Sequence, residues 1–286
     1  MSVESIASTG FYGQFWMPGE GSSPRPAVLE FGGSEGGIDG QFLGADLASA
    51  GFPTLDIAYF GEPGLPSTLQ DIPLEYFAGA LSWLARQPGV RANQMYVSGV
   101  SRGSEAALLL GVHYPALVHG VIASSPSDLA FGAFPDTLNP AWTFEGHPVP
   151  YSTAFSSLVP TIDPAAEIPV QEIQGPVLLD CGTADLVWTS CAYAEAAQTR
   201  LTSADDRYLH VLYRYRGAGH FVGDLVPYLL TTAPVGEGGG STPQANANAD
   251  ARLWPHVLSF LKDPATGQSG TFTAPSTPPK LGFASR

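Results

Sequence analysis

The strongest constraint on the fold is an apolar run that passes through a serine between two glycines into an Ala/Leu-rich run. From Met95 to Leu110 the chain reads Met-Tyr-Val-Ser-Gly-Val-Ser-Arg-Gly-Ser-Glu-Ala-Ala-Leu-Leu-Leu. A buried strand that turns sharply into a helix lifts the serine side chain above the sheet, and glycines on both sides relieve the crowding. The first N–H groups of that helix face the same point, where an oxyanion would form. The stretch therefore predicts a nucleophile elbow at Ser101.

Strand and helix signals alternate along most of the chain. Short apolar runs predict strands at 27–31, 54–59, 94–98, 118–123, 177–181 and 208–215. Apolar residues at helical spacing predict helices at 74–87, 104–113, 192–201 and 252–261. Strands that alternate with helices form βαβ units with right-handed crossovers. We therefore predict one α/β domain over residues 1–262, with a mostly parallel twisted sheet flanked by helices.

Three segments interrupt this alternation. Residues 125–173 are rich in proline and aromatic residues, and loops of this length in a compact domain are usually lids or binding loops. We predict a lid insertion there, after the strand that follows the nucleophile helix. Residues 235–248 are rich in Gly, Ser and Asn and predict a flexible surface loop. Residues 263–286 are rich in Pro, Ser and Thr and predict an extended or disordered tail.

The aromatic residues of the insertion are candidates for an apolar substrate pocket. They could equally pack the insertion onto the domain, and a lid has to do both. These candidates are Phe131, Phe134, Trp142, Phe144, Tyr151 and Phe155.

Composition excludes several classes of partner. The net charge is −14 and the chain has two lysines, Lys262 and Lys280, which argues against nucleic acids and anionic membranes. The same scarcity of cations leaves little to hold the phosphates of coenzyme A. No apolar run is long enough to cross a membrane, and residues 1–10 lack the basic and apolar regions of a signal peptide. We therefore expect a cytoplasmic protein.

The cysteines predict no disulfide framework and no metal site. Cys181 and Cys191 are too few for such a framework, so we expect two reduced, partly buried thiols. Cysteine and histidine residues nowhere show metal-ligand spacing, so we expect neither a metal nor a cofactor.

A serine nucleophile needs a base, and the base needs a carboxylate that orients it. In hydrolases with this elbow, the acid and then the histidine follow the serine along the chain, each on a loop after a strand. Asp185 fits the acid because it lies in the turn beyond the strand at 177–181. Asp180 lies inside that strand and suits a structural role, while Asp224 follows the best histidine and is out of order.

His220 is the best candidate for the base. It follows the strand at 208–215 and a turn that contains Gly217 and Gly219. The other five histidines lie in predicted helices, in predicted strands or in the insertion: His113, His256, His119, His210 and His147.

The Gly-x-Ser-x-Gly pattern occurs a second time, at residues 32–36, so the pattern alone does not identify the nucleophile. Because Ser34 follows the first clear strand, no earlier loop would remain to supply the second oxyanion donor if Ser34 were the nucleophile. We interpret this loop as that donor instead. One N–H then comes from Arg102, the residue after the nucleophile, and the other from Gly33 or Ser34.

These motifs together resemble the acyl-CoA thioesterase / bile acid-CoA:amino acid N-acyltransferase family, in its C-terminal catalytic domain. The similarity covers roughly residues 27–261, and its motifs lie at 31–37, 58–61, 65–66, 72–77, 99–105, 168–170 and 217–220. The resemblance implies an α/β-hydrolase fold with a triad at Ser101, Asp185 and His220. Animal members carry an N-terminal β-sandwich domain, and about two dozen residues precede the first core strand here, so we expect that domain to be missing.

The resemblance also implies the chemistry, which is acyl transfer from a thioester to water or to an amine. Serine as the nucleophile is the variant associated with hydrolysis, whereas the conjugating members use cysteine. We therefore predict a serine acyl hydrolase that cleaves an acyl-CoA or acyl-pantetheine thioester. The alternatives are hydrolysis of an ester, lactone or amide, transfer to an amine, and a non-catalytic binding protein. A homodimer remains open.

Overall fold

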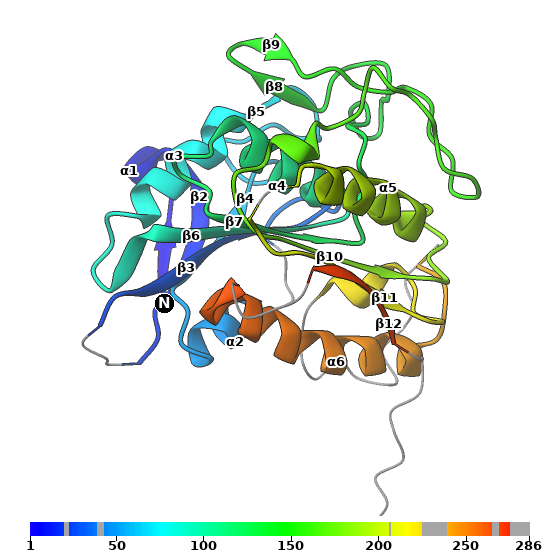
Figure 1. The fold of residues 1–286 in the computed structure, drawn as a ribbon. Coiled ribbons are helices and arrows are strands. Elements are labelled where there is room, and N and C mark those ends of the chain that lie inside the picture. The colour runs from blue at the N-terminus through cyan, green and yellow to red at the C-terminus, as the bar shows by residue number, and fades with distance from the viewer. Residues whose placement is uncertain (20–22, 39–42, 206, 225–238, 265–268, 275–286) are drawn as a thin grey trace, which may run out of the picture.

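A nine-stranded sheet forms the centre of the computed structural model, which describes residues 1–19, 23–38, 43–205, 207–224, 239–264 and 269–274. The strand order is β1-β2-β4-β3-β6-β7-β10-β11-β12 (Figure 1). Strand β2 pairs antiparallel with β1 and β4, and all other neighbours pair in parallel. The strands are β1 (Ser2–Glu4), β2 (Tyr12–Trp16), β3 (Arg25–Phe31), β4 (Thr54–Ala58), β6 (Val90–Val100), β7 (Gly120–Ser124), β10 (Val177–Gly182), β11 (His210–Tyr215) and β12 (Gly270–Ala274).

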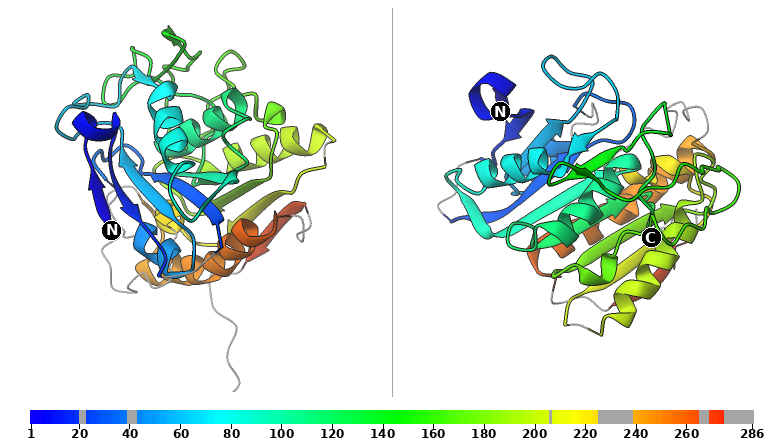
Figure 2. Two further views of the ribbon diagram at one scale, coloured as in Figure 1. Left: turned by 90° about the vertical axis from the view of Figure 1, so that its left-hand side faces the viewer. Right: turned by 90° about the horizontal axis from the view of Figure 1, so that it is seen from above.

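Helices cover both faces of this sheet (Figures 1 and 2). Helices α3 (Leu74–Leu84), α4 (Arg102–His113) and α5 (Ser190–Ser203) lie on one face. Helices α2 (Leu43–Ser49) and α6 (Pro243–Lys262) lie on the other. The remaining short helices are α1 (Ile6–Thr9), η1 (Val170–Glu172) and η2 (His220–Asp224). The predicted mostly parallel sheet with flanking helices is confirmed.

Helix α4 is apolar around most of its circumference, because it lies between the sheet and the residues above it. All residues from Arg102 to Gly111 are buried. A helix that is apolar on every side is stable only when it is covered on every side. Residues 125–173, which we call the insertion, supply part of that cover over α3 and α4 (Figure 1).

The insertion is mostly irregular but is anchored to the domain. Its strands β8 (Trp142–Phe144) and β9 (His147–Pro148) form a small sheet with β5 (Ile72–Pro73). Isolated bridges join Leu69 to Phe134 and Leu129 to Glu167. The movement of this insertion as a lid stays a prediction.

Two segments differ from the sequence predictions. Helix α6 begins at Pro243, so residues 243–248 of the predicted loop are helical, while 235–238 lie outside the described residues. The side chain of Thr242 accepts the N–H of Ala245, and proline at the first helical position needs no partner for its nitrogen. In the predicted tail, 270–274 form β12, where Phe272 stacks on Tyr213 with ring centroids 5.7 Å apart. Residues 275–286 lie outside the described part.

The prediction of two reduced thiols is wrong, because Cys181 and Cys191 form a disulfide. Strand β10 ends at Gly182 and helix α5 starts at Ser190, so the loop between them brings the two Cα atoms within 5.2 Å. The predicted cytoplasmic location stays a prediction. Within the described residues, no helix combines the length and apolarity needed to cross a bilayer.

Breaking this disulfide should destabilise the fold. Closing a loop of ten residues removes entropy from the unfolded chain, so Cys191→Ala should lower the free energy of unfolding by about 2–3 kcal/mol. Urea denaturation followed by circular dichroism measures the change. Dithiothreitol should lower the stability of the wild type and leave the variant unchanged. An equal response of both proteins to the reductant would contradict the prediction.

Candidate active site

The predicted site residues all follow the carboxyl ends of parallel strands. Gly33 and Ser34 come after β3, Ser101 after β6, Asp185 after β10 and His220 after β11. In a parallel sheet these ends meet at one edge, where ligands bind in open α/β folds. The sheet order therefore brings together residues that are far apart in the sequence.

Ser101 has the strained backbone of a nucleophile elbow. Its φ is 55° and its ψ is −122°, a combination that L residues rarely adopt. Its N–H donates to the carbonyl of Ser124 at 3.0 Å, and its own carbonyl accepts the N–H of Ser104 at 3.0 Å. Neighbouring backbone groups thus hold the strained conformation.

Both glycines of the elbow are required by close backbone contacts. A Cβ atom at Gly99 would lie 2.3 Å from the carbonyl oxygen of Gly103. A Cβ atom at Gly103 would lie 2.3 Å from the carbonyl oxygen of Gly32. The first turn of α4 therefore contacts the loop after β3, which explains the two flanking glycines in physical terms.

Asp185 and His220 form a direct pair. The Oδ2 atom of Asp185 lies 2.8 Å from Nδ1 of His220 and also accepts the hydroxyl of Ser190 at 2.6 Å. The Oδ1 atom accepts the backbone N–H groups of Val187 at 2.9 Å and Trp188 at 3.3 Å. The carboxylate is therefore fixed in place, and Nε2 is left as the ring nitrogen that can serve a nucleophile.

Asp180 is a separate buried acid that does not contact His220. It accepts the hydroxyl of Ser124 at 2.6 Å. Burial raises the pKa of Asp180 to about 8, so the carboxyl group stays protonated at neutral pH. This environment fits the structural role that its position inside a strand predicts.

Ser125, which sequence reasoning missed, connects the parts of the site. Its hydroxyl donates to the carbonyl of His220 at 2.6 Å, and its N–H donates to the carbonyl of Asp180 at 2.9 Å. Its carbonyl accepts the indole N–H of Trp188 at 3.0 Å, and its φ of 43° is unusual for serine. The only hint in the sequence is a run of small polar residues directly after a strand.

Two groups of N–H donors lie near Ser101. The N–H of Arg102 opens helix α4, where no preceding turn supplies a carbonyl acceptor. Gly33 lies against the serine, because a Cβ at Gly33 would be 2.9 Å from Cβ of Ser101. The hydroxyl of Tyr59 anchors this loop through the carbonyls of Gly32 at 2.9 Å and Gly33 at 2.5 Å. Burial raises the pKa of Tyr59 well above its ordinary value, so the hydroxyl keeps its proton.

A buried ion pair joins the elbow to the insertion. The Nε atom of Arg102 lies 2.8 Å from Oε1 of Glu105, and Glu105 is fully buried. The guanidinium also donates to the carbonyls of Phe131 and Gly132, both at 2.9 Å. Glu105 in turn accepts the indole N–H of Trp142 at 2.8 Å and the N–H of Phe131 at 3.2 Å. Glu105 therefore has partners in both the elbow and the insertion.

Two of the predicted pocket aromatics, Phe131 and Phe155, connect to His220 through Trp188. The ring of Phe131 lies 5.9 Å from that of Trp188 and 5.7 Å from that of Phe155. Trp188 lies 5.9 Å from His220, and half of Phe155 is exposed. These rings form a continuous series of aromatic contacts between the half-exposed Phe155 and the histidine.

The other predicted aromatics make contacts away from the triad, and their role in a substrate pocket stays a prediction. Trp142 is buried against Glu105, and Phe144 stacks on His113 at the far end of α4 with ring centroids 4.1 Å apart. Tyr151 donates its hydroxyl to the carbonyl of Leu138, and Phe134 is 49% exposed. None of these contacts involves Ser101 or His220.

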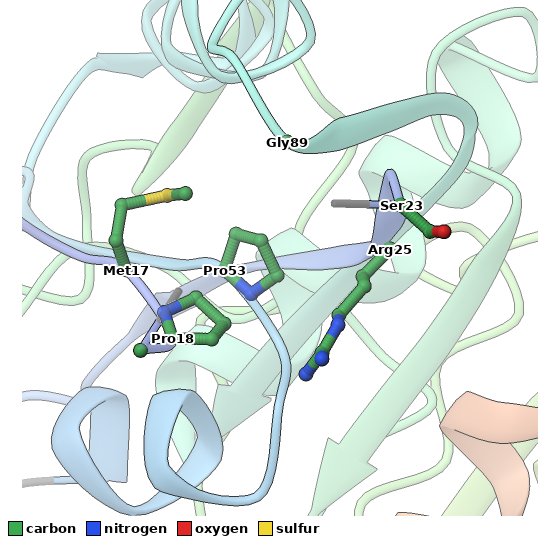
Figure 3. A pocket seen from close by; sticks show the side chains of 7 residues that line it. Met17, Pro18, Ser23, Arg25, Pro53 and Gly89 are labelled. Atoms are coloured by element: carbon green, nitrogen blue, oxygen red, sulfur yellow. The ribbon is translucent and has the colours of Figure 1, made fainter. Parts of the chain in front are cut away.

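A separate hollow of about 120 Å³ lies at the opposite end of β3 (Figure 3). Arg25 is the first residue of that strand. Its guanidinium donates to the carbonyl of Gly51 at 3.2 Å and so joins β3 to the turn after α2. The other residues that border the hollow are Met17, Pro18, Gly19, Ser23, Pro53 and Gly89. This hollow is not part of the candidate site.

The chain is similar to known proteins over most of its length. The family model described as BAAT / acyl-CoA thioester hydrolase C terminal matches residues 72–266. Acyl-coenzyme A thioesterase 1 of Homo sapiens is 26% identical over 94% of this chain and 66% of its own length. Acyl-coenzyme A amino acid N-acyltransferase 2 of Rattus norvegicus is 28% identical over 91% of this chain and 65% of its own length. The chain spans 56–66% of the length of the human relatives it matches.

Solved structures show the fold. An α/β-hydrolase enzyme from a Medee basin deep-sea metagenome library superposes with a TM-score of 0.55 at 15% identity. The match covers 83% of this chain and 86% of that one. The predicted α/β-hydrolase fold is confirmed.

Removing the buried carboxylate of Glu105 should destabilise the protein strongly. Glu105→Ala leaves the guanidinium of Arg102 buried without its partner, which should cost about 3–5 kcal/mol of unfolding free energy. Chemical denaturation measures this loss. Glu195→Ala removes a half-exposed partner of Arg214 and should cost less than about 1 kcal/mol. Similar losses in the two variants would contradict the assignment of a special role to the buried pair.

Proposed function

Because the chain belongs to the BAAT / acyl-CoA thioester hydrolase C-terminal family, we propose that it is a serine acyl hydrolase that cleaves an acyl thioester. Ser101 is the nucleophile, His220 the base and Asp185 the acid that orients the base. The observation that carries this assignment is the 2.8 Å contact between Asp185 and Nδ1 of His220, at the sheet edge that also holds the strained Ser101.

The reaction proceeds through an acyl-enzyme. His220 takes the proton of Ser101 through Nε2 as Oγ attacks the carbonyl carbon of the thioester. The oxyanion receives hydrogen bonds from the N–H of Arg102 and from the loop after β3. Collapse of this intermediate breaks the carbon–sulfur bond, and His220 protonates the leaving thiolate. Water, deprotonated by His220, then attacks the acyl-enzyme. The bond between the acyl carbon and Oγ breaks, Ser101 takes its proton back from His220, and the acid is released.

The surroundings of the site favour an apolar acyl group and an uncharged leaving group. The rings of Phe131, Phe155 and Trp188 lead to His220 and offer contact to an acyl chain. The net charge of −14 disfavours the phosphates of coenzyme A. A pantetheine thioester therefore fits at least as well as a coenzyme A thioester.

Covalent labelling tests the nucleophile. A fluorophosphonate probe should label the folded wild type at Ser101, as identified by peptide mass spectrometry, and Ser101→Ala should abolish the label. Asp185→Asn should lower kcat about 10³–10⁴-fold, because the amide favours the wrong tautomer of His220. Absence of labelling in folded wild-type protein would instead favour a non-catalytic binding protein.

A substrate series tests the bond that is cleaved. We expect hydrolysis of an acyl-pantetheine thioester with a kcat/KM at least equal to that of the matching acyl-CoA, and lower turnover of the p-nitrophenyl ester. Thiol release and mass spectrometry of the acid product provide the measurements. Equal or faster turnover of the ester would overturn the thioester assignment, and an amide product formed with an added amine would identify an acyltransferase.

A further inference from the structure

A carboxylate accepts the backbone N–H of Gly33, a residue that lies against the proposed nucleophile. The side chain of Glu35 accepts the backbone N–H of Gly33 through Oε1 at 2.6 Å. Its other oxygen, Oε2, lies 3.0 Å from the position that a Cβ atom would take at Gly33. That same position is 2.9 Å from Cβ of Ser101. Glu35 and Ser101 therefore approach Gly33 at the same place.

The backbone of the loop fixes the direction of this N–H group. The hydroxyl of Tyr59 donates toward the carbonyls of Gly32 and Gly33 and so holds these two peptide units in place. In a trans peptide the N–H points opposite to the carbonyl of the same unit. The N–H of Gly33 therefore points away from Tyr59 and toward the carboxylate of Glu35, which accepts it. Of the two residues that the sequence leaves open, Gly33 is favoured by its contact with the nucleophile, because its Cβ position is 2.9 Å from Cβ of Ser101.

We propose that the N–H of Gly33 is the second oxyanion donor and that Glu35 competes with the substrate for it. This inference rests on the proposed acyl transfer at Ser101. A hydrogen bond to a carboxylate is stronger than one to a neutral thioester carbonyl, so the resting contact must be broken when substrate binds. The oxyanion that forms next is itself negative, and a carboxylate beside it would raise the energy of the transition state.

The side chain of Glu35 has room to leave. It is exposed to solvent, and the two residues that follow it are Gly36 and Gly37, with φ values of 75° and 76°. Rotation of the side chain into water frees the N–H without moving the backbone that Tyr59 holds. Glu35 thus sets how readily the donor becomes available, which makes it a determinant of the acylation rate.

Substitution of Glu35 tests this competition. Glu35→Ala should raise the second-order rate of Ser101 acylation about fivefold, because a charged competitor is replaced by water. Glu35→Gln keeps a weaker, neutral acceptor and should raise the rate by a smaller factor. A trifluoromethyl ketone, which forms an oxyanion adduct with the serine, should bind Glu35→Ala more tightly by a similar factor.

A nearby carboxylate provides the matched control. Glu62 lies on the neighbouring loop, with Oε1 3.3 Å from the Cβ position of Gly37, so Glu62→Ala removes the same charge without touching Gly33. This control should leave acylation unchanged. A slower reaction of Glu35→Ala, an unchanged one, or an equal gain in Glu62→Ala would each overturn the inference. Failure of the proposed function is distinct, because wild-type Ser101 would then resist the fluorophosphonate.

Discussion

The close approach of two backbones at Gly103 and Gly32 is the constraint on which the site depends. With 2.3 Å between a Cβ at Gly103 and the carbonyl of Gly32, any side chain there would push α4 away from the loop after β3. The N–H of Arg102 would then separate from Gly33, and the strained turn at Ser101 would lose its support. The nucleophile and both candidate donors therefore depend on one contact between main chains.

Polar side chains in the interior join this contact to the rest of the molecule. Arg102 and Glu105 reach upward from the elbow to the backbone of Phe131, whose ring packs toward Trp188 and His220. Removal of one charge from such a buried pair leaves its partner unpaired at high cost. The insertion is therefore part of the structure that holds the elbow, and a rearrangement of the insertion would disturb the elbow.

The sequence was sufficient for the features that depend on local pattern and chain order. The strand–serine–helix run, the order of Ser101, Asp185 and His220, and the alternation of strands and helices are all readable in this way. Contacts that form only in the folded chain could not be read from the sequence in this way. Cys181 and Cys191 meet because a loop turns back.

Strand β12 is another feature that the local pattern could not show, because its partner is nearly sixty residues away in sequence: Gly270 pairs with Val211. The roles of Ser125 and Glu35 likewise depend on neighbours from other strands or on the shape of one turn. Residue type alone carried little signal for them, since serines after strands and glutamates in glycine-rich loops are common in proteins.

The disulfide between Cys181 and Cys191 makes the loop of Asp185 a covalently closed unit. Its two ends are joined where β10 stops and α5 starts, and the carboxylate inside is held by Val187, Trp188 and Ser190. Leu186 projects from this loop and is 56% exposed. Leu186 can therefore be replaced while Asp185 keeps its geometry. The loop could therefore diversify, by evolution or by engineering, without rebuilding the scaffold beneath it.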